Sequence, residues 1–124
     1  MNIIVRAYLI ELARKRFNQT VTYQKLSDDC KLGFNMHANP SDRLAIASIL
    51  DTISRYEHSF ERPLLSALVI RASDSREGDG FYTLAQELGF GEAKKLKKER
   101  IFEVSQIKKC ISFWEDNENY NLFK

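Results

Sequence analysis

The residues that most resemble a catalytic motif form an acid–alanine–lysine pattern, Glu92-Ala93-Lys94. Two aspartates, Asp74 and Asp79, precede it along the chain. Nucleases use two acids and a lysine in this order to hold a divalent ion and activate a water molecule. That chemistry requires the pair on a strand beside the first acid, whereas here the pair follows Gly91 and opens a charged, helix-like stretch. An acidic side chain at a helix start complements the helix dipole. The pattern therefore predicts a helix start rather than a nuclease site.

The two histidines and two cysteines are the other candidates for catalysis or metal binding. His37, His58, Cys30 and Cys110 are separated by irregular gaps and form no Cys-x-x-Cys or His-x-x-x-His spacing. The glycines match neither a dinucleotide fingerprint nor a phosphate-binding loop. We therefore predict a non-enzymatic protein with no metal and no cofactor, in which both cysteines are free thiols.

The composition is typical of one globular domain. The chain has 124 residues, of which 44% are hydrophobic and 29% charged, a balance that allows a packed core without disulfides. Its longest uninterrupted apolar runs, such as Ala67–Ile70, are far shorter than the about 20 residues that cross a bilayer. We therefore expect a single domain over residues 1–124 that is cytoplasmic and does not contact a membrane.

Helical periodicity organises the first half of the chain. Apolar spacing predicts an amphipathic helix over residues 2–16, and Thr22 can cap a second helix over residues 23–31. A third helix is expected to start at Ser41 or Asp42 and to end before the next proline. Its predicted core face consists of Ile46, Ile49, Leu50, Ile53, Tyr56 and Phe60.

The second half mixes one strand with further helices. Residues 64–70 indicate a buried strand that enters the turn-forming run 73–80, which is either a wing or a free loop. A short helix is expected over residues 81–88, and the last amphipathic helix allows a break near Lys98. The polar residues 115–124 are typical of a loose C-terminal tail, in which Tyr120, Leu122 and Phe123 are candidate anchors onto the core. The predicted fold class is α+β, mainly helical, with a small antiparallel sheet or wing.

The segment Thr22–Ser27, followed by Gly33, a further helix and a strand, resembles the winged helix-turn-helix unit of the alkyltransferase-like DNA-binding domains. The resemblance covers about the middle half of the chain and implies a winged-helix-like core. That family carries a Pro-Cys-His-Arg motif where this chain has Arg62–Leu68, which contains no cysteine. The resemblance therefore does not extend to accepting alkyl groups.

Four patterns give the whole chain a second resemblance, to a group of small bacterial proteins of unknown role. The patterns are Thr22-Tyr23-x-x-Leu26, Arg62–Ile70, Gly80-Phe81-Tyr82-x-Leu84-Ala85 and Phe113-Trp114. In outline only, through its size and expected compartment, the chain also resembles immunity proteins that neutralise toxins delivered between bacteria. That likeness implies a toxin domain as partner.

These features lead us to expect a protein-binding module. The formal net charge is a modest +2, and aromatic side chains in irregular segments are a residue type enriched at protein interfaces. The expected partner is another protein, with a toxin domain as one class. The predicted contact residues are Phe34, His37, Asp74, Arg76, Asp79, Tyr120 and Phe123.

A winged-helix nucleic-acid-binding protein is the alternative. The third helix would then enter the major groove, and a basic cluster further along the chain would neutralise phosphates. Acidic residues such as Asp51 on the helix and Glu99 in the cluster oppose this use. The residues that would contact nucleic acid are Arg43, Arg55, Lys94, Lys95, Lys97 and Lys98.

Overall fold

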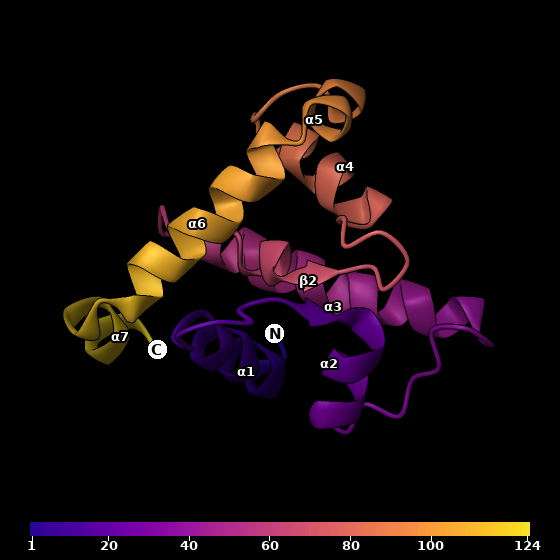
Figure 1. Ribbon diagram of the computed structural model, residues 1–124, viewed down its shortest axis with the longest axis horizontal. Helices are drawn as coiled ribbons and strands as arrows, with labels where there is room; N and C mark the ends of the chain where they lie inside the picture. Colours follow the sequence, from indigo (N-terminus) through magenta and orange to yellow (C-terminus); the bar gives the residue numbers. More distant parts are fainter.

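Helices dominate the computed structural model, which describes all residues from Met1 to Lys124 (Figure 1). None of the helices is long and apolar enough to cross a membrane. In chain order the elements are α1 (Ile3–Ala13), β1 (Val21–Thr22), α2 (Tyr23–Asp29), α3 (Pro40–Ser59), the 3-10 helix η1 (Leu65–Leu68), β2 (Val69–Ile70), α4 (Asp79–Glu87), α5 (Ala93–Glu99), α6 (Ile101–Glu115) and α7 (Asn117–Phe123).

The first two predicted helices are confirmed, each slightly shorter than expected. The side chain of Asn2 accepts a hydrogen bond from the Val5 amide at the start of α1, and Thr22 Oγ1 accepts one from the Lys25 amide at the start of α2. The third helix starts earlier than predicted, with Asn39 as its cap. Proline suits the first helical position because its missing N–H has no partner there in any case.

The predicted antiparallel sheet is wrong. Val21 of β1 pairs with Val69 of β2, and the two strands run parallel. The long α3 lies between them in sequence. It forms part of the connection that carries the chain back to the end at which β1 began, which a parallel pair requires. Most of the predicted strand over residues 64–70 is instead η1, and only its β-branched end extends. Residues 72–75 then form a turn that is closed by a hydrogen bond from the Arg71 amide to the carbonyl of Arg76 at 2.8 Å.

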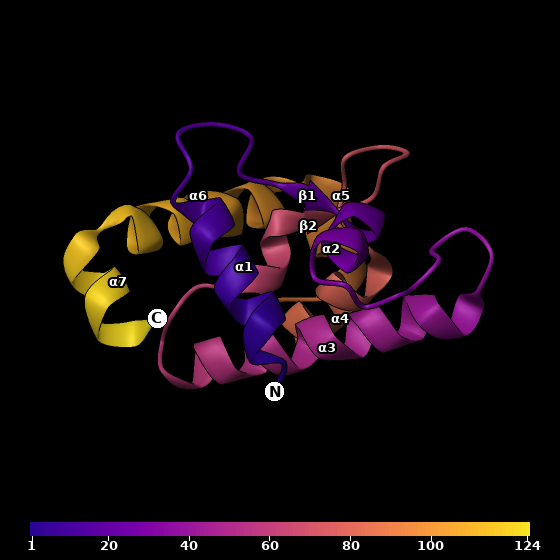
Figure 2. The same ribbon diagram turned by 90° about the horizontal axis from the view of Figure 1, so that it is seen from below.

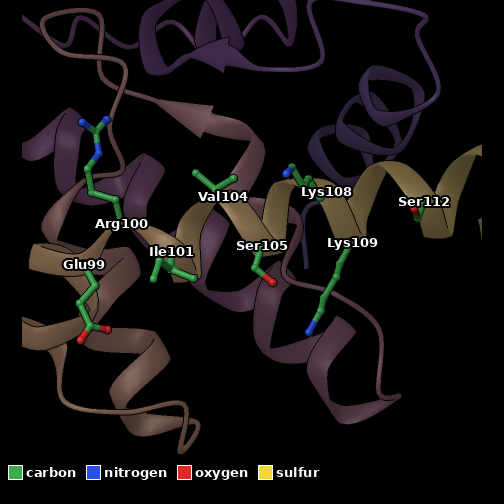
Figure 3. Close-up of a pocket in the computed structure, with 8 residues that line it drawn as sticks. All are labelled: Glu99, Arg100, Ile101, Val104, Ser105, Lys108, Lys109 and Ser112. Carbon is green, nitrogen blue, oxygen red and sulfur yellow. The ribbon is translucent and has the colours of Figure 1, made fainter.

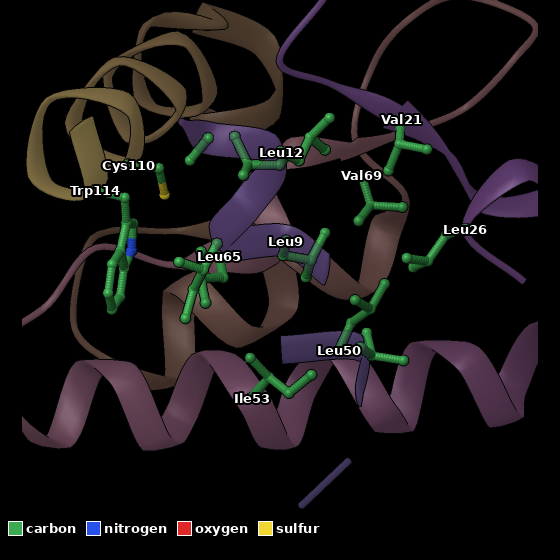
Figure 4. Packing of buried hydrophobic residues seen from close by; sticks show 14 of the residues in the cluster. Leu9, Leu12, Val21, Leu26, Leu50, Ile53, Leu65, Val69, Cys110 and Trp114 are labelled. Atoms are coloured by element: carbon green, nitrogen blue, oxygen red, sulfur yellow. The ribbon is translucent and has the colours of Figure 1, made fainter. Parts of the chain in front are cut away.

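Two adjacent groups of buried side chains form the core. The larger group joins α1, α2, α3 and α6 around η1, and Figure 4 shows side chains from α1, α3 and α6 converging on Leu65. The smaller group lies under α4 and α5. The 3-10 helix serves both, since Leu65 and Leu68 face the larger group whereas Leu64 and Ala67 face the smaller. Its side chains therefore hold α4 in a fixed position against α3.

The buried face of α3 differs from the predicted one. Tyr56 and Phe60 are exposed by 38% and 58%, whereas Ser54 and Glu57 are fully buried. Glu57 turns inward because two arginines lie on that side of the helix, Arg6 at 3.3 Å and Arg62 at 2.7 Å. The two aromatic rings cover these arginines from outside.

The C-terminal segment is helical instead of a loose tail. Asp116 caps α7 by accepting a hydrogen bond from the Glu118 amide at 2.9 Å, and the helix lies beside α1 (Figure 2). Arg6 Nη2 donates to the carbonyl of Phe123 at 2.8 Å, and Tyr120 donates to Glu11 at 2.5 Å. Side chains of α1 thus bind the Phe123 carbonyl and the Tyr120 hydroxyl, and these contacts attach α7 to the rest of the fold.

The expected break in the last helix falls at Arg100. Its backbone adopts a left-handed conformation with φ 63°, ending α5 and starting α6 at the same residue. The two helices therefore meet at an angle, and their basic side chains lie on adjoining segments of surface.

Candidate functional site

A groove of about 980 Å³ lies between α3 and α4. We call it the α3–α4 groove. The N-terminal half of α3 forms one wall and α4 forms the other. The start of α2, the Met36–His37 loop and the residues after β2 close its ends. Its main lining side chains are Tyr23, Gln24, Met36, His37, Arg43, Leu44, Ile46, Ala47, Leu50, Asp51, Arg71, Asp79, Phe81, Thr83, Leu84 and Glu87.

The floor of this groove is apolar. Ile46 and Leu50 come from α3, and Phe81 and Leu84 come from α4; all four side chains belong to the packed interior. Leu44 stands on the α3 wall with 73% of its surface exposed. Because the floor side chains are already buried, the exposed Leu44 provides the main apolar surface that a ligand would remove from water. The groove is thus suited to a ligand that carries apolar side chains.

The rim carries both signs of charge. Arg55 donates to Asp51 at 2.7 Å and also contacts Glu87, which links the two walls. Lys97 of α5 donates to Asp79 at 2.7 Å, and this hydrogen bond holds the pKa of Asp79 below its usual value. Asp79 is therefore ionised at neutral pH, and each of the rim carboxylates Asp51, Asp79 and Glu87 has a cation beside it.

A tyrosine fixes one end of the groove. The hydroxyl of Tyr23 accepts a hydrogen bond from the Gly78 amide at 3.2 Å, joining the start of α2 to the start of α4. Burial is the main cause that raises the pKa of Tyr23 to about 12, so the ring remains neutral. A side chain at position 78 would meet this hydroxyl at 2.8 Å, so glycine permits the approach. The end of the groove is thereby held by a specific contact.

The predicted protein-contact residues do not form one surface. His37 and Asp79 line the groove, and Asp74 lies next to it through a 2.6 Å ion pair with Arg71. Arg76 points inward to Glu103. The backbone of half-buried Phe34 is bound to α2. The remaining two, Tyr120 and Phe123, belong to α7 and pack near α1.

The predicted nucleic-acid contacts are also divided. Arg43 lines the groove and donates to the Met36 carbonyl at 2.8 Å. Arg55 is held between Asp51 and Glu87, and Lys97 is paired with Asp79. The other three, Lys94, Lys95 and Lys98, are exposed on α5.

Sequence reasoning missed the groove residues Tyr23, Leu44 and Arg71. Leu44 lies two residues before Ile46, the first residue of the apolar stripe of α3, and its residue type alone does not distinguish a groove residue from a core leucine. The role of Tyr23 depends on its hydrogen bond with Gly78, which is distant in sequence, so the local sequence gives no sign of it. These residues meet because η1 positions α4 beside α3, and that packing has no short-range pattern.

Sequence reasoning also missed a buried cluster around Glu103 of α6. Arg76 and Tyr82 both donate to its carboxylate at 2.7 Å. Burial alone would raise the pKa of Glu103, but the two hydrogen bonds lower it below the usual value. Glu77 lies nearby, completely buried, and neither of its carboxyl oxygens has a hydrogen-bond partner. Burial, followed by the charge on Glu103, raises the pKa of Glu77 to about 10.

The cysteine and histidine side chains belong to no metal-binding group. Both cysteines are free, and the buried Cys110 thiol donates to the Leu64 carbonyl at 3.2 Å. No group of three or more histidine, cysteine, aspartate or glutamate side chains lies together in a way that could hold a metal ion.

Comparison with known proteins provides no relative for this chain. No family model, no curated protein and no solved structure matches it. The groove and the charged surfaces described above are therefore the basis for a functional proposal.

Proposed function

We propose that this chain is a non-enzymatic protein-binding module that holds a segment of another protein in the α3–α4 groove. The observation that carries the proposal is the combination of an apolar floor, an exposed leucine at position 44 and a rim of mixed charge. Protein segments present apolar side chains together with polar groups of both signs, and grooves between two helices commonly receive them.

The charges of the groove favour a protein over nucleic acid. Nucleic-acid affinity depends mainly on neutralising phosphates, whereas Asp51, Asp79 and Glu87 surround the exposed face of α3. Two of the cations assigned to the winged-helix alternative, Arg55 and Lys97, are already bound to these carboxylates. With these cations already paired, the surface around α3 offers a duplex little uncompensated positive charge, so we rank the winged-helix alternative second.

The specific form of the proposal is an immunity-type protein of the cytoplasm that neutralises a toxin domain. It rests on the size of the chain and its outline likeness to immunity proteins. A module of this kind works by covering a surface of its target, which requires a fixed groove rather than a reactive group. The link from Tyr23 to Gly78 supports such a role because it holds the groove end in place.

An affinity experiment with a groove-blocking variant tests the proposal. Tagged protein would be used to capture partners from lysate of the source cells, with and without nuclease treatment. The substitution Ala47→Trp fills the groove from an exposed position on α3, and Ala7→Trp places the same ring at an exposed position on α1. We expect a nuclease-resistant protein partner that binds wild type and Ala7→Trp but is lost with Ala47→Trp.

A second pair of substitutions tests the apolar contribution. Leu44→Ser removes the exposed leucine of the groove, and Ile4→Ser removes an equally exposed side chain from α1. Weaker capture with the first and unchanged capture with the second supports the proposal. Recovery of nucleic acid that disappears on nuclease treatment and at high salt would replace it with the winged-helix alternative.

A further inference from the structure

A second hollow lies along the outer face of α6 and shares no residue with the α3–α4 groove. It has a volume of about 620 Å³, and Figure 3 shows most of its side chains along α6, with Glu99 at the end of α5 and Arg100 at the junction of the two helices. We call it the α6 face. Its lining residues are Glu99, Arg100, Ile101, Val104, Ser105, Lys108, Lys109 and Ser112.

The α6 face belongs to the most basic segment of the chain. Residues 93–112 contain seven basic and two acidic side chains, although the whole chain has a formal net charge of only +2. The rest of the chain is therefore net negative, and the positive charge is concentrated on α5 and α6. One of the two acids, Glu103, is buried against Arg76 and does not face solvent.

Almost all basic side chains of this segment are free of ion pairs. Lys97 is bound to Asp79, but the other six are exposed and form no salt bridge. Arginines elsewhere are largely paired with carboxylates, as in Arg55 with Asp51 and Arg62 with Glu57. The six exposed, unpaired side chains are Lys94, Lys95, Lys98, Arg100, Lys108 and Lys109.

The α6 face has exposed apolar side chains between its basic ones. Ile101 is exposed by 72% and Val104 by 46%, and both stand between basic side chains. Ser105 and Ser112, two turns apart on the same face, have small side chains that allow another helix to approach closely. An apolar centre with a charged rim is the usual layout of a protein interface.

From this layout we infer that the α6 face binds an acidic amphipathic helix of a partner protein. Carboxylates of the partner helix pair with Arg100, Lys108 and Lys109, while its apolar stripe covers Ile101 and Val104. The lysines of α5 add to the positive electrostatic potential at the Arg100 end of the face, which attracts an acidic partner. The surface lacks the aromatic side chains on which single-stranded nucleic acid stacks. The apolar centre would gain nothing from a phosphate backbone.

Fluorescence anisotropy with a synthetic peptide tests this inference. The probe is a labelled helical peptide with leucine at positions i, i+3 and i+7 and glutamate at most other positions. We expect saturable binding to the full chain that weakens at high salt. The double variant Lys108→Glu/Lys109→Glu should bind at least about tenfold more weakly, because two attractive contacts become repulsive. Ile101→Ser/Val104→Ser should bind about threefold to tenfold more weakly.

Matched controls separate the face from general charge and from the groove. Lys25→Glu/Lys31→Glu makes the same change of net charge on and just after α2 and should leave the affinity unchanged. Ala47→Trp blocks the α3–α4 groove and should also leave it unchanged. A loss of peptide binding with Ala47→Trp would place the peptide in the groove and overturn the inference. Circular dichroism confirms that each variant is folded.

Three other occupants are outcomes that would overturn the inference. Duplex DNA, vesicles of phosphatidylserine and phosphatidylcholine, and the chain itself are each tested with the same α6 variants, the last by sedimentation over a range of concentrations. Tighter binding of any of these than of the peptide, lost on reversal of Lys108 and Lys109, would assign the face to that occupant. Failure of the folded wild type to bind the peptide would also refute it.

Discussion

Two buried groups of charged side chains have opposite imbalances of charge. In the first, two guanidinium groups, Arg6 and Arg62, share the single carboxylate of Glu57. In the second, the single guanidinium of Arg76 faces two carboxyl groups, Glu103 and Glu77. The first group has one positive charge too many and the second would have one negative charge too many.

The surplus arginine is accommodated by contacts with a backbone carbonyl and with aromatic rings. Arg6 has a further acceptor in the Phe123 carbonyl, and its planar group lies 5.3 Å from the ring centre of Tyr56. Arg62 lies 4.9 Å from the ring centre of Phe60. Aromatic faces attract cations, and the attraction strengthens when water is excluded. A guanidinium also carries five N–H donors, so one carboxylate and a carbonyl can be shared between two of them.

The surplus carboxyl is accommodated by holding a proton. A carboxylate has no comparable interaction with ring faces, and no donor lies within reach of the Glu77 oxygens. Burial and the neighbouring Glu103 therefore raise the pKa of Glu77 to about 10, so that the group is neutral at physiological pH. The comparison shows two ways to accommodate an extra buried ionisable group. The extra arginine is stabilised by hydrogen bonds and aromatic rings, whereas the extra carboxyl group of Glu77 is neutralised by a bound proton.

The largest effect should come from breaking the first group. Glu57→Ala leaves two buried guanidinium groups without their carboxylate, and removing one partner of a buried ion pair costs about 3–5 kcal/mol. We expect a fall of that size in the free energy of unfolding, measured by urea titration. Glu115→Gln, an exposed glutamate of α6, is the control and should change stability little. Equal effects of the two substitutions would contradict the comparison.

A smaller effect of opposite sign should come from the second group. Glu77→Gln keeps the shape of the side chain and removes the proton that the folded state must bind, so we expect stabilisation at neutral pH of about 1–3 kcal/mol. Because the folded pKa of about 10 exceeds the ordinary value of 4.5, the contribution of Glu77 is fully present below pH 4.5 and is lost as pH rises toward 10.

The pH dependence gives this prediction its control. The wild type should lose stability between those two pH values with a slope of up to about 1.4 kcal/mol per pH unit, and the Glu77→Gln variant should lose much of that slope. Urea titrations of both proteins across the interval measure it. Parallel pH profiles for the two proteins would show that Glu77 is ionised in the folded state.

The smallest effect should come from the same chemistry at the surface. Arg55 bridges Asp51 and Glu87 across the groove, but its side chain is 43% exposed. Exposed ion pairs contribute about 0–1 kcal/mol, so Arg55→Met should change the free energy of unfolding by no more than about 1 kcal/mol. Thermal unfolding at low and high salt measures it. A loss comparable to that of Glu57→Ala would mean that exposure does not separate the two kinds of pair.

The sequence predicted the helices well where capping side chains act locally. Thr22 and the break near Lys98 are examples, since a hydroxyl cap and a charged junction act within a few residues. The burial of Glu57 lies in the helical pattern of Leu50 and Ile53, but a charge on that face could be understood only with Arg6, which is 51 residues away. The predicted contact residues were chosen without such long-range information, and the fold distributes them over several surfaces.

Long-range packing decides both the sheet and the site. Strand direction depended on where α3 returned the chain, and residues 64–68 coiled into η1 because their side chains fill two cores at once. His37 and Asp79 reach the same groove only after η1 has positioned α4. The predicted contacts on α7 were drawn instead to α1, where Arg6 and Glu11 provided partners.

The short ladder between β1 and β2 has a consequence for the order of folding. It joins Val21 to Val69 and Thr22 to Ile70 and contains no other pair. Closing a loop of that length costs entropy before the two rungs repay it. The ladder is therefore a late event that follows the docking of α3 and η1. The segment from Lys15 to Thr22 should be among the last to gain amide protection during refolding and among the first to lose it when the native state opens.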